Sequence, residues 1–115
     1  MSRRDDTVPM RHMLDYAREA VTFVSGKSRG DLDRDRVLQL ALTRVITIVG
    51  EAARRVSPEG RARYAGIPWQ DAIGARNKIM HGYEFVDYDI VWQIITVEFP
   101  QLIESLERVF PGHQS

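Results

Sequence analysis

The stretch RVLQLALTRVITIVGEAARRV, residues 36–56, decides the fold of this chain. Its apolar residues recur at intervals of three and four, which is the spacing of one face of an α-helix. They are Val37, Leu38, Ala41, Leu42, Val45, Ile48, Val49, Ala52 and Val56. Because this apolar stripe is wide, we expect a helix that starts at Asp31 or Asp33, ends near Val56 and lies at the centre of the core.

Helical spacing continues before and after this stretch. A first helix is predicted from about Asp5 to Val24, followed by a loop at residues 25–30. Its apolar stripe consists of Met10, Met13, Leu14, Ala17, Val21 and Val24. Ser57 followed by Pro58 is typical of a helix cap and first helical position, and predicts a short helix that ends near Tyr64.

The C-terminal half predicts two more long helices. One runs from about Trp69 to His81, where Gly82 is expected to stop it in the left-handed conformation. The other begins near Asp87 or Asp89 and ends near Phe110. These two carboxylates could suggest a metal site, but carboxylates near a helix start more often act as caps. Pro100 lies inside its apolar pattern and should kink or divide it. Trp69 and Trp92 could stack on bases, but both lie beside apolar positions, which favours packing in the core or at a dimer interface.

Alternation typical of strands is absent, so the predicted fold is an all-α, up-and-down four-helix bundle with a short extra helix and a kinked last helix. The 115 residues fit a single domain spanning residues 1–115. With 16 basic and 16 acidic side chains the formal net charge is zero, which argues against a broadly basic nucleic-acid binder but leaves room for a local basic patch.

The chain contains no cysteine, which excludes disulfides and thiolate metal sites. No apolar run approaches the roughly 20 residues of a membrane span, and the first residues contain no apolar signal segment. We therefore expect a cytoplasmic protein that is not bound to a membrane.

Chemically reactive side chains are concentrated in residues 76–83, RNKIMHGY. A histidine at a helix end, such as His81, can take and give a proton near neutral pH. The Arg76 guanidinium suits phosphate oxygens, and Asn77 and Tyr83 add neutral hydrogen-bonding groups. Together they suit abstraction of a proton from an RNA 2′-hydroxyl and its attack on the adjacent phosphorus, a reaction that needs no metal ion or cofactor. Each residue alone is more often a surface or capping residue.

The spacing of Arg76 and His81 raises a geometric problem. Five residues apart on a regular helix, they point about 140° away from each other. Either the helix unwinds before His81, or each residue meets its counterpart from a second subunit in a two-fold dimer. We prefer the dimer.

A second polar group follows the central helix. Arg44, Thr47, Glu51 and Arg54 or Arg55 recur at helical spacing. Glu51 could orient Arg76 or His81, or this edge could simply be a solvated face. Gly50, in mid-helix, could permit a close approach of another helix.

Around these residues the sequence resembles a known family. Arg76, His81 and Tyr83 match the R-x4-H-x-Y motif of HepT-like toxins of the HEPN superfamily (higher eukaryote and prokaryote nucleotide-binding). Further similarity lies in IVGEAA (48–53) with SPE (57–59), in IPW (67–69) leading to Arg76-Asn77, and in VD (86–87) leading to IVW (90–92). The match spans roughly residues 38–109.

The resemblance implies the toxin of a type VII (HEPN/MNT) toxin–antitoxin system: a homodimeric, metal-independent endoribonuclease with catalytic Arg76 and His81 and a supporting Asn77. It also implies an MNT-type nucleotidyltransferase antitoxin, which silences the toxin by adding AMP to Tyr83, by binding, or by both. The alternative is a subunit of the same fold that binds a nucleotide or a partner without catalysis. A purely structural dimerisation domain is a third possibility.

Overall fold

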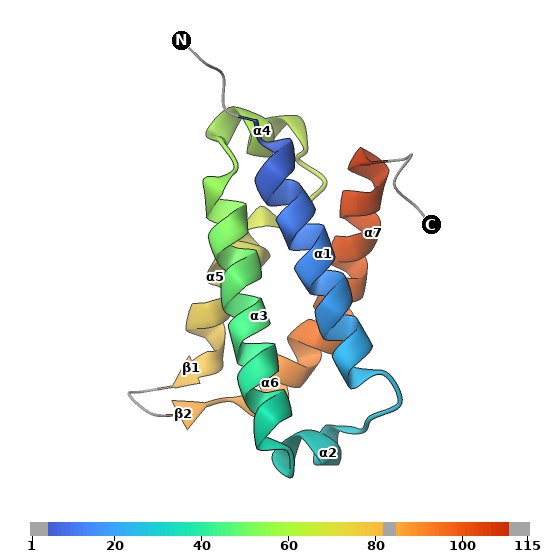
Figure 1. Ribbon diagram of the computed structural model, residues 1–115. Coiled ribbons are helices and arrows are strands. Elements are labelled where there is room, and N and C mark those ends of the chain that lie inside the picture. The colour runs from blue at the N-terminus through green and yellow to red at the C-terminus, as the bar shows by residue number, and fades with distance from the viewer. Residues whose placement is uncertain (1–4, 82–84, 111–115) are drawn as a thin grey trace.

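The structure, a computed structural model, describes residues 5–81 and 85–110 and is built almost entirely of helices (Figure 1). The predicted all-α bundle is confirmed. The elements in chain order are α1 (Thr7–Val24), α2 (Arg29–Asp33), α3 (Arg36–Arg55), α4 (Pro58–Arg63), α5 (Trp69–Ile79), β1 (Met80–His81), β2 (Phe85–Val86), α6 (Tyr88–Gln93), the π-helical turn η1 (Ile94–Glu98) and α7 (Phe99–Val109).

Helix α3 is central, as its apolar stripe predicted, because it packs against both α1 and α5. Its buried residues are Leu38, Leu42, Val45, Ile46, Val49, Gly50, Ala52 and Ala53. The expectation that Val37 joins this stripe is wrong, since its side chain is 77% exposed. Val37 lies about 100° around the helix from Leu38, on the side that faces away from the core.

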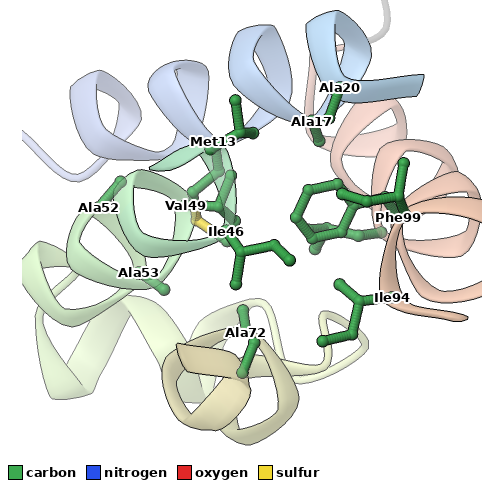
Figure 2. Close-up of a cluster of buried hydrophobic side chains, with 14 of the residues drawn as sticks. Met13, Ala17, Ala20, Ile46, Val49, Ala52, Ala53, Ala72, Ile94 and Phe99 are labelled. Atoms are coloured by element: carbon green, nitrogen blue, oxygen red, sulfur yellow. The ribbon is translucent and has the colours of Figure 1, made fainter. Parts of the chain in front are cut away.

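Figure 2 shows the middle of the core, where side chains from four parts of the chain point toward one another. Met13, Ala17 and Ala20 come from α1, Ile46, Val49, Ala52 and Ala53 from α3, Ala72 from α5, and Ile94 and Phe99 from the last helical region. Several of these core residues are alanines, whose small side chains let helices pack closely. No polar or charged residue is buried within residues 5–81 and 85–110.

Helices α3 and α5 approach each other closely at Gly50. A Cβ atom at this position would lie 2.9 Å from the carbonyl oxygen of Ala72 on α5. The prediction that Gly50 permits a close approach is therefore confirmed, and the contact sets how α5 lies against α3.

Side-chain caps define most of the helix starts. Asp35 caps α3 by accepting from the Leu38 amide at 3.0 Å, and Ser57 caps α4 ahead of Pro58 as predicted. The loop expected at residues 25–30 is shorter than predicted, because Ser28 and Asp31 form a reciprocal capping box that starts α2.

The segment after α5 departs from the prediction. The helix ends at Ile79 rather than His81, and the chain turns back as a short antiparallel hairpin, although no strand was expected. The Asp87 amide donates to the Ile79 carbonyl at 2.7 Å, which satisfies one of the carbonyls that every helix leaves unpaired at its C-terminus. Gly82, the predicted helix stop, lies outside the described residues.

The last helical region is divided just before Pro100, as predicted. The Phe99 amide donates to the carbonyl of Ile94, five residues back, which produces the wide turn η1. Pro100 then lies in the first turn of α7, where its missing N–H is tolerated.

Trp69 is 6% exposed, and its indole N–H donates to the carbonyls of Arg61 and Tyr64, both at 3.1 Å. Packing rather than base stacking is thus confirmed for this residue. Within the two described ranges, no helix combines the length and apolar character that crossing a membrane requires.

Candidate functional site

The residues predicted to carry the chemistry gather at one end of the bundle, where α5 ends, the hairpin turns and α6 begins (Figure 1). Ala72, Ala75 and Ile79 anchor α5 in the core, so the helix delivers its last turn to this end in a fixed orientation. The site is open rather than enclosed, because the side chains of Arg76, Asn77 and His81 are all exposed.

Arg76 lies in the last turn of α5. Within the part of the chain that the structure describes, its guanidinium forms no hydrogen bond and no ion pair. Lys78, two residues later, differs in this respect, since its ammonium is 3.2 Å from the Glu98 carboxylate of η1. Among the described residues, the Arg76 charge therefore has no partner, whereas Lys78 ties α5 to η1.

His81 lies in β1, two residues beyond the end of α5, and its side chain is 59% exposed. The predicted extension of the helix to His81 is therefore wrong, because α5 ends at Ile79 and His81 belongs to the hairpin. Because α5 ends before His81, the 140° separation of a continuous helix no longer applies. Of the two alternatives for the geometry, the structure shows the first, because the helix ends before His81. The two-fold dimer is a separate proposal.

The imidazole instead lies beside a carboxylate. Nε2 of His81 is 3.7 Å from Oδ2 of Asp87, which is too long for a hydrogen bond but close enough for an ion pair when His81 is protonated. Asp87 caps α6, as predicted, since its Oδ1 accepts from the amides of Asp89 and Ile90 at 3.1 and 3.2 Å.

The proximity of Asp87 to His81 was missed from the sequence. His81 and Asp87 are six residues apart, and this spacing predicts no contact unless the chain folds back as a hairpin. With the pairing His81↔Phe85, His81 and Asp87 become diagonal neighbours on one face.

An arginine-supported carboxylate also lies nearby, since Arg29 of α2 donates to Asp89 at 2.8 Å and to Asp33 at 2.9 Å. These carboxylates, Asp33 first, raise the pKa of Arg29 above its ordinary value.

Glu51 lies on the exposed side of α3 together with Arg44 and Arg54. Among the described residues it forms no ion pair or hydrogen bond with Arg76 or His81. Helices α3 and α5 run in opposite directions (Figure 1), and Gly50 lies level with Ala72. Arg76 is about 6 Å further along α5, so the residues of α3 at its level are near Thr47 rather than Glu51.

Of the remaining predicted groups, Asn77 belongs to the described residues and Tyr83 does not. Asn77 is exposed beside Arg76 on α5. Tyr83 lies outside the described residues, and so its position relative to His81 is not part of the geometry above.

Comparison with known proteins places the chain among ribonuclease-like sequences. The sequence model of the ribonuclease HepT-like family matches residues 13–109. A protein of Methanocaldococcus jannaschii, provisionally named an RNase, is 27% identical over 109 residues, which cover 95% of this chain and all of the relative. A second provisionally named RNase, from Caldanaerobacter subterraneus subsp. tengcongensis, is 32% identical and covers 87% of this chain and 89% of its own length.

A third relative, named probable ribonuclease HepT and found in Thermococcus cleftensis, is 28% identical over 65% of this chain and 68% of its own length. No solved structure matches the chain with statistical significance. The family match covers most of the chain, including α5, the hairpin and α6, where Arg76, His81 and Asp87 lie. The chain therefore belongs to the ribonuclease HepT-like family.

Proposed function

We propose that this protein is a metal-independent endoribonuclease and the toxin of a type VII (HEPN/MNT) toxin–antitoxin system that acts on RNA in the cytoplasm. The observation that carries the proposal is the placement of Arg76 and His81. An arginine without an ion-pair partner in the described chain lies in the last turn of α5, and a solvent-accessible histidine follows in the hairpin. A base and a cation are the two groups needed for attack of a ribose 2′-hydroxyl on the adjacent phosphorus.

In the proposed reaction, neutral His81 takes the proton from a ribose 2′-hydroxyl. The 2′-oxygen forms a bond to the adjacent phosphorus and the bond from phosphorus to the 5′-oxygen breaks, so that a 2′,3′-cyclic phosphate remains. The proton then passes to the leaving 5′-oxygen. Arg76 stabilises the negative charge that develops on the phosphoryl oxygens, and Asn77 donates a further hydrogen bond.

We also propose that the active form is a homodimer. Three large apolar side chains are exposed at the end of the bundle that carries His81: Val37 at 77%, Leu40 at 54% and Phe85 at 74%. Val37 and Leu40 lie on the outward face of α3, and Phe85 pairs with His81 in the hairpin. A two-fold contact through this surface would cover the apolar groups and bring two copies of the site together.

Regulation by an antitoxin is the third part of the proposal. An MNT-type nucleotidyltransferase would add AMP to Tyr83, two residues after His81, or bind over the site. The added phosphate would compete with the RNA phosphate for Arg76. Incubation with the nucleotidyltransferase and ATP should add the mass of AMP to the wild type but not to Tyr83→Phe. AMP on the Tyr83→Phe protein would move the modified site elsewhere.

The nuclease is tested with labelled RNA in the presence of EDTA. The wild type should cleave the RNA, and His81→Ala and Arg76→Ala should cleave it at least about a hundredfold more slowly. His12→Ala and Lys78→Ala are matched controls, because His12 is exposed on α1 and Lys78 already has a carboxylate partner. Binding of RNA or nucleotide without cleavage by the wild type would favour the non-catalytic subunit instead.

The dimer is tested by sedimentation. Leu40→Asp on α3 should give a monomer with impaired cleavage. Val8→Asp, which changes an exposed apolar residue on α1 instead, should leave the association unchanged. A strict monomer that still cuts RNA would contradict the dimeric arrangement.

A further inference from the structure

The hairpin places one carboxylate beside the proposed base, and this carboxylate is held more firmly than the base itself. Asp87 is joined to α5 through its backbone amide, which donates to the Ile79 carbonyl at 2.7 Å. Its Oδ1 accepts from two amides at the start of α6. Its carbonyl also accepts from the Val91 amide at 3.0 Å, so four hydrogen bonds fix the residue, and only Oδ2 remains directed at His81.

Among the described residues, the His81 side chain has no comparable support. His81 is the last described residue before the hairpin turn, and more than half of its side chain is exposed. Among residues 5–81 and 85–110, Asp87 supplies the one ion-pair contact of the imidazole. An unsupported exposed histidine samples several rotamers, which lowers the fraction of molecules in which it can act as a base.

We propose that Asp87 is the positioning residue for His81, an inference that rests on the proposed ribonuclease function. A small rotation of the exposed imidazole closes the 3.7 Å separation between Nε2 and Oδ2 to hydrogen-bonding distance. The carboxylate then holds the proton on Nε2, so the lone pair on Nδ1 accepts the proton of the 2′-hydroxyl. Asp87 also stabilises the imidazolium that results, until the proton moves to the leaving 5′-oxygen.

The double role of Asp87 dictates the choice of variants. Asp87→Ala would remove both the cap of α6 and the contact with His81. Asp87→Ser keeps a good capping oxygen but is too short to reach the imidazole, whereas Asp87→Asn keeps both the cap and the reach without the charge. Asp89→Asn is the matched control, since it removes a carboxylate two residues away that pairs with Arg29 and not with His81.

We expect Asp87→Ser to unfold at the same temperature as the wild type within about 3 °C, because the cap is retained. Its kcat should fall roughly tenfold with KM changed less than about twofold, since positioning of the base affects the transition state and not ground-state binding. Asp87→Asn should not recover the loss, because with Oδ1 capping α6 its amide nitrogen donates to Nε2 and leaves the imidazole proton on Nδ1, the atom that must act as the base. Asp89→Asn should retain wild-type kcat.

Two measurements separate this inference from the proposed function. In the His81→Ala background, Asp87→Ser should have no further effect on residual cleavage, because Asp87 acts through the imidazole. Independently of any cleavage, NMR coupling constants should show one dominant χ1 rotamer for His81 in the wild type and averaging in Asp87→Ser. Averaging in both proteins, or an undiminished kcat in Asp87→Ser, would overturn the positioning role. A wild type that does not cleave RNA but keeps the single rotamer would refute the nuclease alone.

Discussion

The contact between Gly50 and α5 leads to a prediction whose sign can be worked out from the structure. In Gly50→Ala the new Cβ would lie 2.9 Å from the Ala72 carbonyl oxygen, 3.6 Å from that of Ile73 and 3.9 Å from its Cα. These are backbone atoms within a helix, so they cannot rotate away. The two helices must move apart by several tenths of an ångström, in a region where α3 and α5 form much of the core.

Two opposing terms determine the magnitude. Alanine is favoured over glycine in a helix interior by about 1 kcal/mol. Overpacking of a close contact costs typically about 1–3 kcal/mol. Because the nearest atom is backbone, the upper part of that range applies, and we expect a net loss of about 1–2 kcal/mol in the free energy of unfolding. For a chain of this size that corresponds to a fall of roughly 4–8 °C in Tm.

Gly74 provides the matched control. It lies inside α5, and a Cβ there would meet no other described atom within 4 Å. Gly74→Ala therefore gains the helix propensity without the clash and should be more stable than the wild type by about 0.5–1 kcal/mol. Thermal and urea unfolding of both variants, followed by circular dichroism, should show a lower free energy of unfolding for Gly50→Ala and a higher one for Gly74→Ala. A Gly50→Ala protein as stable as Gly74→Ala would refute the close-packing argument.

Other predictions concern single contacts. Trp69→Phe leaves the Arg61 and Tyr64 carbonyls without their shared indole donor, and urea unfolding should show a loss of about 1–2 kcal/mol. Arg18→Ala breaks the 2.6 Å ion pair between α1 and α7 and should cost about 0.5–1 kcal/mol, more than Arg108→Ala in its exposed pair with Glu104; equal losses would contradict this. Hydrogen bonds from the Ser28 amide and hydroxyl lower the pKa of Asp31 below its ordinary value of 3.8. The Asp31 carboxylate therefore stabilises the fold at pH values above 3.8, and this stabilisation is lost as the pH falls through the lower pKa of the folded state. Acid unfolding of Asp31→Asn should lack this pH-dependent loss of stability. RNA binding should weaken steeply with salt in a filter-binding assay, since phosphate contacts dominate it, and Arg76→Ala should reduce the slope.

The order and type of the main helices could be read from the sequence with useful accuracy. The stripe on α3, the Ser57-Pro58 start of α4 and the interruption before Pro100 depend on contacts within one or two helical turns. The error at Val37 arises instead from the packing of helices against one another. An apolar residue is in a stripe by spacing, but its burial depends on which neighbouring helix covers that side, and none covers Val37.

The local pattern of residues 76–92 predicted the chemistry but not its geometry. Arg76, Asn77 and His81 are recognisable as reactive groups by type and spacing alone. The hairpin depends on two short segments finding each other across a turn, and two-residue strands leave no alternating pattern to detect. For this reason His81 was expected on a helix, and Asp87 was expected only as a cap.

Local sequence therefore determined the main helices, some of their caps and the choice of candidate site residues, because these follow from the type and spacing of neighbouring residues. The tertiary structure alone decided which groups meet. Backbone contact at Gly50 sets α5 against α3, and the hairpin brings the Asp87 carboxylate to the His81 imidazole. Such contacts join residues whose separation along the chain carries no periodic signal, so they emerge only when the chain is folded.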